Sequence, residues 1–347
     1  MKSILFTTLI TTVISTNAHA ENISTKNESI DQSSQVVATF KQRPGNPSIT
    51  PDGRLLVSLH PLDQPNTKVV EVSIGDLKSP YPSKHFSEGE NSLLKAVIAI
   101  RTDDQGVAWM LDLATHKVYG WDTRKNTLVN TIQIPEKVLR PKSFLQDFAL
   151  DQKRNRIIIA DMTQSDLKSK PEPAFITVDL NTGKAVRVAE NHPSMLPDSS
   201  GGFALNPITI DPNYEWVYFG ALNGHEIYRV KASYFDNNGE DVADNIHRYA
   251  PKPYSDGITV DSQQNVYIAD IEHNAIGVSN PKEYKVITYL GKNQTWPDGL
   301  AFGPDNYIYA TVNQLDKSAA LNKGKNKGTP PYQVIKIKPI ANGSTGR

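Results

Sequence analysis

Five short apolar runs in this sequence each begin with an Asp or Asn side chain. These residues are Asn46, Asp147, Asn206, Asp256 and Asp298, and Asn313 ends the partner of the last run. Carboxylates and amides that converge can hold a hard cation such as calcium, bind an amine or a polyol, or act as general acid and base. Alternatively, each side chain caps the turn into its run by bonding to the backbone.

The stretch 255–270 shows the repeating unit that carries these residues. It consists of a polar loop, a short apolar run rich in β-branched residues, a turn, a second apolar run and an acid. This order is typical of a β-hairpin. Similar hairpins begin at Asn46, Ala96, Asp147, Asn206, Asp256 and Asp298. The turns follow one another at roughly 45 to 60 residues, which is close to the period of a propeller blade.

Two further strands follow most of the hairpins, for example 117–121 and 128–132 after the second. Six units of four antiparallel strands predict an all-β fold, a six-bladed β-propeller. The sixth unit shows no clear fourth strand after 334–337. We expect the early strand 35–40 to complete it, so that the two ends of the domain pair.

Strand direction predicts which polar residues share a face. The residue before the first strand of a unit and the residue after its second strand emerge on the same side, near the central axis. The second group therefore consists of His60, Asp112, Asp161, Asp270 and Asn313. The acids in the hairpin turns belong to the opposite face, where we interpret them as turn formers: Asp52, Asp151, Asp211, Asp261 and Asp305. A small polar funnel on a rigid scaffold is a common place for a binding site.

Aromatic residues and one long loop complete the expected funnel. Trp296 and Phe203 precede first strands and are candidates for its walls, whereas Trp109, Trp216 and Tyr267 fit the core. The segment 314–332 leaves the last second strand on the same face and is either a lid or a plain surface loop. No pair of histidines has the spacing of a zinc site.

Composition narrows the classes of function. The 347 residues carry 37 basic and 37 acidic side chains and no cysteine. Balanced charge argues against nucleic acid as a partner, and the lack of cysteine excludes disulfides and Cys-based catalysis. Residues 1–20 have the features of a secretory signal peptide. We expect a disordered leader at 21–34, one domain at 35–347, export to the periplasm or the medium, no membrane contact after cleavage, and a monomer.

The hairpin motifs resemble those of the Yellow or major royal jelly protein family, in its bacterial branch, over nearly the whole mature chain. The matching segments are 43–46, 106–112, 148–151 with 159–161, 205–207 with 217–222, 255–276 and 296–313. The resemblance implies a secreted six-bladed propeller. Known members bind small ligands such as biogenic amines in the central funnel, and dopachrome conversion has been proposed for others. Asn313 matches an Asn of the family, but the disulfide cysteines of insect members are missing.

The chain is more distantly similar to gluconolactonase and senescence-marker propellers, which hold a divalent metal through a Glu, an Asn and an Asp. Asn206 and Asp256 fit that pattern, whereas Asn46 stands where the Glu should be. We therefore expect a protein that binds a small polar or cationic molecule, without a cofactor. Asp256 and Asp298 would give charge, and Asn46, Asn206 and Asn313 orientation. The alternatives are a metal-dependent lactonase with a cation such as calcium, a dopachrome-type isomerase, or a scaffold for protein partners.

Overall fold

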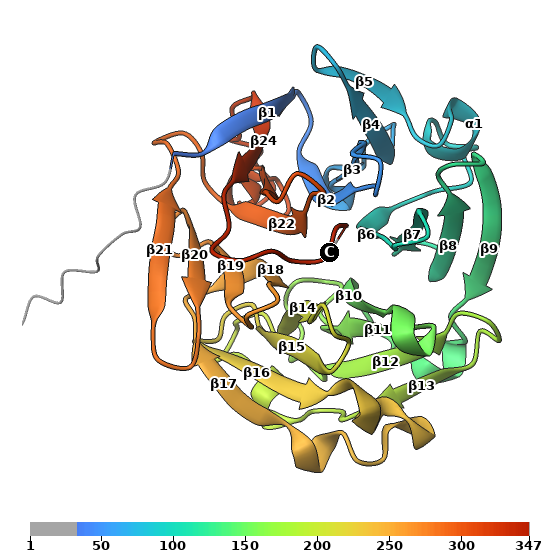
Figure 1. The fold of residues 1–347 in the computed structure, drawn as a ribbon, viewed down its shortest axis with the longest axis vertical. Helices are drawn as coiled ribbons and strands as arrows, with labels where there is room; N and C mark the ends of the chain where they lie inside the picture. Colours follow the sequence, from blue (N-terminus) through green and yellow to red (C-terminus); the bar gives the residue numbers. More distant parts are fainter. Residues whose placement is uncertain (1–32, 347) are drawn as a thin grey trace, which may run out of the picture.

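The computed structural model describes residues 33–346, which fold into six four-stranded antiparallel sheets arranged around a central axis (Figure 1). The predicted signal peptide and most of the predicted leader lie outside the described residues. Within residues 33–346, no helix is long and apolar enough to cross a membrane. The single α-helix of this part, α1 (Lys84–Ser87), lies in the loop after the first sheet.

Each of the first five blades is formed by four consecutive strands. Blade 1 contains β2 (Pro44–Ile49), β3 (Leu55–Leu59), β4 (Val69–Ser73) and β5 (Leu77–Pro80). Blade 2 contains β6 (Val97–Thr102), β7 (Val107–Asp112), β8 (Lys117–Asp122) and β9 (Thr127–Gln133). Blade 3 contains β10 (Leu145–Asp151), β11 (Arg156–Asp161), β12 (Ala174–Asp179) and β13 (Ala185–Val188).

Blade 4 contains β14 (Leu205–Ile210), β15 (Trp216–Ala221), β16 (Glu226–Lys231) and β17 (His247–Pro251). Blade 5 contains β18 (Ser255–Val260), β19 (Val266–Asp270), β20 (Ala275–Ser279) and β21 (Tyr284–Tyr289). Blade 6 contains β22 (Pro297–Phe302), β23 (Ile308–Val312), β24 (Tyr332–Ile337) and, as its outer strand, β1 (Gln35–Phe40). The predicted fold is confirmed, and so is the pairing of the early strand with the end of the domain.

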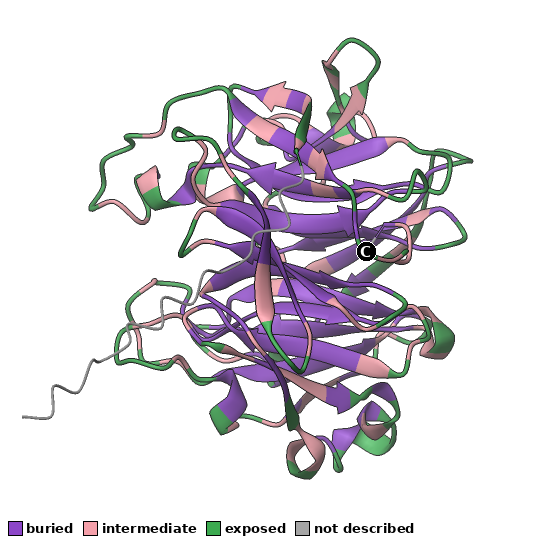
Figure 2. Ribbon diagram, turned by 60° about the vertical axis from the view of Figure 1, so that its left-hand side comes forward, coloured by how far each residue is buried: buried purple, intermediate pink, exposed green. Residues whose placement is uncertain are grey.

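The first strand of every blade lies innermost, and apolar side chains fill the space between neighbouring blades. Phe175 of blade 3, for example, meets Phe219 of blade 4 edge to face, with ring centroids 4.8 Å apart. Figure 2 shows that the inner strands are buried along most of their length, whereas exposed residues gather in the loops. This packing is rigid, because side chains at such density have few alternative positions.

Every inner strand contains a β-bulge near its start, and this corrects one expectation. The polar residues Asn46, Asp147, Asn206, Asp256 and Asp298 do not precede the inner strands but lie inside them. The register shifts between Pro44 and Pro47, for instance, and between Ser255 and Ile258. A bulge leaves a residue without a direct partner and re-aims its side chain. The sequence pattern locates the residues but not this irregularity, because the apolar alternation begins only after the bulge.

The segment after β24 closes one end of the channel, which the sequence analysis does not foresee. It crosses the centre of the ring to the C-terminus labelled in Figure 1. Gly343 forms a bridge with Asp261, Thr345 forms one with Phe302, and the carbonyl of Gly346 accepts from the amide of Thr102 (3.4 Å). These contacts are made with the ends of inner strands on the side of the hairpin turns. The channel is therefore a blind pocket with its mouth on the opposite face.

Tyr267 fixes this segment and provides a test of its contribution to stability. The hydroxyl of this buried residue donates to Asp261 (2.9 Å) and accepts from the amide of Ile340 (2.7 Å). Replacing Tyr267 by Phe should lower the free energy of unfolding by about 1–3 kcal/mol, because buried partners lose their hydrogen bonds. Urea unfolding measures this change. Tyr309→Phe is the matched control, because its hydroxyl bonds to the exposed Asp305 (2.9 Å) and holds no second segment; an equal loss in both variants would contradict the role of the segment.

Candidate functional site

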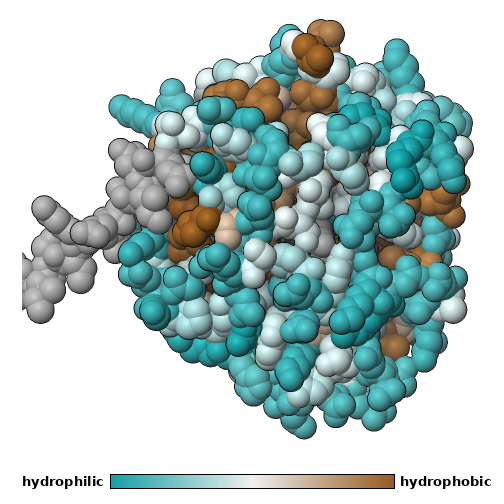
Figure 3. Space-filling model, in the orientation of Figure 1, coloured by the Kyte–Doolittle hydropathy of each residue, from teal (hydrophilic) through white to brown (hydrophobic). Residues whose placement is uncertain are grey.

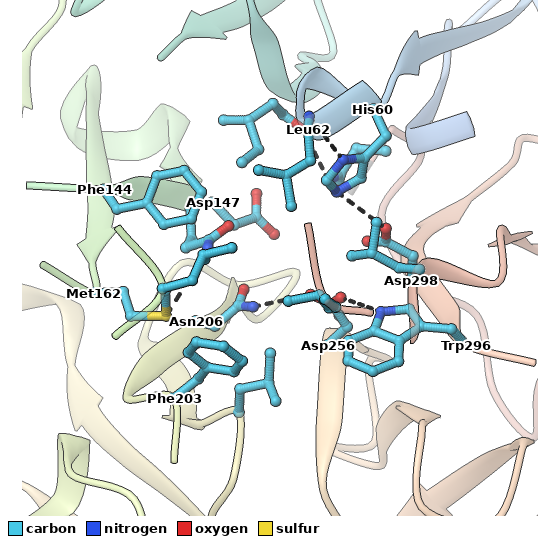
Figure 4. Close-up of a pocket in the computed structure, with 18 residues that line it drawn as sticks. His60, Leu62, Phe144, Asp147, Met162, Phe203, Asn206, Asp256, Trp296 and Asp298 are labelled. Atoms are coloured by element: carbon cyan, nitrogen blue, oxygen red, sulfur yellow. Dashed lines mark hydrogen bonds and ion pairs between the residues drawn. The ribbon is translucent and has the colours of Figure 1, made fainter. Parts of the chain in front are cut away.

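A pocket lies on the axis at the face opposite the segment after β24 (the tail), and Figure 4 shows side chains from different blades converging around it. Its polar side chains are called the floor below, and its apolar side chains the walls. The void between the lining side chains, counted out to its open mouth, is about 630 Å³. The polar side chains of the lining are Asn46, His60, Gln146, Asp147, Asn206, Asp256 and Asp298. The apolar ones are Leu62, Ile98, Phe144, Met162, Leu167, Phe203, Leu222, Trp296, Leu315 and Leu321. Five of the six predicted ligand-binding residues thus line one cavity.

Two glycines allow the polar residues to crowd around the axis. A Cβ on Gly257 would lie 2.3 Å from the carbonyl oxygen of Asp298, and one on Gly299 would lie 2.8 Å from the Cα of Asn46. Side chains at these positions would push the inner strands apart. Glycine is therefore required after Asp256 and Asp298, because it lets the inner strand that carries each acid approach the neighbouring blade.

Asp256 belongs to the polar floor and contacts residues of two other blades. Its carboxylate accepts a hydrogen bond from the side-chain amide of Asn206 (2.9 Å) and another from the indole of Trp296 (2.7 Å). Burial raises the pKa of Asp256, and these two hydrogen bonds oppose the rise. The predicted wall residue Trp296 is thus both a wall and a hydrogen-bond donor to the floor.

Asp298 faces His60 across the floor. The Oδ2 atom of Asp298 accepts from the side-chain amide of Asn313 (2.6 Å) and lies 3.8 Å from Nε2 of His60. Burial, and then the charge of Asp256, raise the pKa of Asp298 well above its usual value. Burial lowers the pKa of His60 to about 4. Because Nδ1 of His60 accepts from the amide of Leu62 (3.3 Å), the proton of the neutral ring is assigned to Nε2, which faces Asp298.

Asp147 is the one acid of the floor that has a full cationic partner. Nη2 of Arg101 donates to Oδ2 of Asp147 at 2.5 Å, and Nη1 of the same arginine donates to Oδ1 of Asn46 at 2.9 Å. Burial raises the pKa of Asp147 to about 6, although the positive charge of Arg101 opposes the rise. Neither Asp256 nor Asp298 forms an ion pair with a lysine or arginine of residues 33–346. The charges of the floor are therefore unequally compensated.

Arg101 is the central residue that the sequence analysis missed. It lies in β6, the only one of the six inner strands without an Asp or Asn near its bulge, and it is only 4% exposed. The sequence did contain a sign of its role, because an arginine inside a mostly apolar inner strand needs a buried acid as its partner. The strand pattern alone could not say which acid, since Asp147 belongs to the next blade.

The other polar residues predicted for this face have structural contacts. Asp112, Asp161 and Asp270 accept hydrogen bonds from backbone amides of the turns that follow them, such as those of Ala114, Thr163 and Glu272. Asn313 lies behind Asp298, where it also donates to the carbonyl of Pro44 (2.9 Å), and it is not part of the pocket lining. Such backbone contacts describe Asp112, Asp161 and Asp270 of the second group, whereas His60 of that group lines the pocket together with the first group.

The long loop after β23 contributes directly to the pocket wall through Leu315 and Leu321. The buried Arg43 anchors this loop. Its guanidinium donates to Asp63 (2.7 Å), to the side chain of Asn326 (2.8 Å) and to the carbonyl of Gln314 (3.3 Å). Asp63 belongs to the short helix that carries the wall residue Leu62. One arginine thus ties two wall-forming loops together, so this segment is part of the pocket wall.

Known proteins place the chain in a family. A model of the major royal jelly protein family matches residues 97–328. The chain belongs to this family. No curated protein sequence matches it.

Three solved structures with the same fold are only distantly related in sequence. A luciferin-regenerating enzyme is 13% identical with a TM-score of 0.63, and the match covers 91% of this chain and 98% of that one. A calcium-binding protein, regucalcin, from Agrobacterium tumefaciens is 12% identical with a TM-score of 0.56 over 92% and 98%. A gluconolactonase from Xanthomonas campestris is 11% identical with a TM-score of 0.56 over 90% and 94%. At such identities the likeness shows the fold alone.

The buried His60 gives a test of the electrostatics of the floor. Its pKa in the folded state is about 4, below the ordinary 6.5. The stability that neutral His60 provides is therefore present above pH 6.5 and is lost as the pH falls toward 4. The free energy of unfolding of the wild type, minus that of His60→Asn, should fall by about 3 kcal/mol across this window.

Chemical denaturation at several pH values measures this difference. His192→Asn is the matched control, because His192 also precedes a proline and caps a short helix but lies outside the pocket lining. Its pKa is lowered as well, but the residue is less buried, so its slope should be smaller. A difference for His60 that does not change with pH would contradict the assignment of a neutral imidazole.

Proposed function

We propose that this member of the major royal jelly protein family is an exported protein that binds a small polar or cationic molecule in the blind pocket. The observation that carries the proposal is the pair Asp256 and Asp298, two buried carboxyl groups at the bottom of one cavity without a lysine or arginine partner in residues 33–346. A protonated amine would supply the missing positive charge and would make charge-assisted hydrogen bonds. Such bonds are strong where water is excluded.

The walls favour a ligand with an apolar body as well as a polar head. Phe203, Trp296 and Phe144 surround the pocket together with the polar side chains (Figure 4). Aromatic faces attract cations and apolar rings alike. An amine whose charged group points to the floor and whose carbon skeleton lies between these rings would use both halves of the pocket.

The face of the protein shown in Figure 3 offers little support for the alternative of a scaffold for protein partners. On the face shown in Figure 3, hydrophobic side chains form small, scattered groups in a mostly hydrophilic surface. Broad apolar patches mark many protein–protein interfaces. The scaffold alternative has no such patch on this face to support it, whereas the pocket offers convergent polar groups.

Neutralising the two acids should strongly weaken the binding of cationic ligands. Asp256→Asn with Asp298→Asn removes two charge-assisted contacts of about 1.5–3 kcal/mol each, so the dissociation constant for an amine should rise by at least about 100-fold. A thermal-shift screen of amines, sugar lactones and divalent ions selects the ligand, and calorimetry then compares the variants. Asp305→Asn, with the same change of charge on the turn side, is the control. Unchanged affinity in the double variant would refute the proposal.

An isomerase is the second candidate, and the pair His60 and Asp298 favours it. A carboxyl whose pKa is raised and a neutral imidazole lie 3.8 Å apart at the pocket floor. The carboxylate of Asp298 can take a proton from one atom of a ligand and return it to another. The Nε2–H of His60 can meanwhile donate a hydrogen bond to the charge that forms in between, and together these steps make a tautomerisation. If this occurs, His60→Asn should lower the turnover of a dopachrome-type substrate by about 100-fold or more while binding remains. Steady-state kinetics on both proteins measures the effect.

A further inference from the structure

The floor of the pocket has its own buried cation. Arg101 is absent from the residues that line the pocket and lies beneath them. Its guanidinium is held by the side-chain oxygen of Asn46 (2.9 Å), the carboxylate of Asp147 (2.5 Å) and the carbonyl of Ile100 (3.0 Å). All three acceptors are oxygen atoms, and two come from other blades. The guanidinium therefore bridges blades 1, 2 and 3 at the axis.

Oxygen atoms of this kind are also the ligands that calcium takes in proteins. The resemblance to metal-dependent propellers implies such an ion, held by Asn206 and Asp256. The arrangement found here does not fit it well. The amide group of Asn206 is directed as a donor toward Asp256 (2.9 Å), and the oxygens of Asn46 and Asp147 already bond to Arg101. Among residues 33–346, no group of three or more acidic or histidine side chains is arranged to hold a metal ion.

The charge of Arg101 is a second reason why this site does not fit a divalent metal ion. The positive charge of Arg101 acts on Asp147 and reaches Asp298 as well. A divalent ion at the oxygens of Asn46 and Asp147 would share these oxygens with the guanidinium and would therefore lie close to its positive charge. Both repulsion and space would oppose its binding, because the interaction of two cations at such a distance is only weakly screened in a buried site.

We propose that Arg101 is the built-in cation of this channel, so that the pocket floor is organised by a guanidinium instead of a divalent metal. Arg101 neutralises Asp147 and orients Asn46, which leaves Asp256 and Asp298 as the acids that face a ligand. The proposal is independent of the ligand. It concerns the layer beneath the pocket and stands whether or not an amine binds above it.

One substitution should turn this layer into a cation site. Arg101→Met keeps much of the apolar volume of the side chain but removes its charge. The oxygens of Asn46 and Asp147 are then without a cation, close to Asp256 and Asp298. Calcium should bind there and stabilise the variant, because a ligand that binds only the folded state raises its melting temperature.

The experiment compares the purified wild type with Arg101→Met, Arg101→Lys and Arg156→Met. Calcium is added up to about 10 mM, above the range of weak extracellular calcium sites. Thermal unfolding and calorimetry are the readouts. We expect an upward shift of at least about 2 °C for Arg101→Met and none for the wild type or for Arg101→Lys, which keeps a positive charge.

Arg156→Met controls for the loss of any buried arginine. Arg156 is paired with Asp151 (3.1 Å) and Asp236 (2.9 Å) outside the pocket lining, so its removal should destabilise the protein without a response to calcium. If Arg101→Met folds only when calcium is present, as followed by circular dichroism, the proposal is supported.

Two results would overturn the proposal. The first is one calcium ion bound per wild-type chain. This result would refute the proposal even if Arg101→Met does not fold at all. The second is a folded Arg101→Met variant without any response to calcium. Neither result bears on the binding of amines by Asp256 and Asp298, so this proposal and the proposed function can fail separately.

Discussion

The close approach of the inner strands around one axis is the constraint on which the rest of this structure depends. Six strands begin near the same line, and each contributes a side chain to a space that excludes most water. Polar groups in such a space must bond to one another, since an unpaired buried polar group costs about 1–3 kcal/mol. The bulges, the Asp-Gly pairs and the contacts among the amides and acids of the floor all follow from this crowding.

The same crowding explains the division between floor and wall. At the axis, side chains from different blades meet at hydrogen-bond distance, so polar residues there can satisfy one another. Farther out, the loops diverge, and Leu315, Leu321 and Phe203 fill the larger gaps. Arg43, which is buried, holds two of these loops by hydrogen bonds to both. The pocket thus has a floor set by the blades and walls set by the loops.

The sequence predicted the repeating parts of this architecture well. Alternation and turn residues located the six hairpins, and strand direction brought Asn46, Asp147, Asn206, Asp256 and Asp298 to one pocket. The features that the sequence did not predict are single contacts that do not recur from blade to blade. Arg101 needs a partner in another blade, the tail crosses the channel once, and Asn313 is displaced behind Asp298. Such contacts join residues far apart in the chain, and no local pattern encodes them.

The tail, which closes one end of the channel, determines how small molecules can enter and leave the pocket. In a ring with two open ends, one molecule could enter from one side while another left from the other. Here Gly343 and Thr345 form bridges next to the inner strands at the far end, so the mouth of the pocket is the single route for both entry and exit. A ligand of the kind proposed would have to leave by the way it entered before the next one could bind, so the part that entered last would leave first.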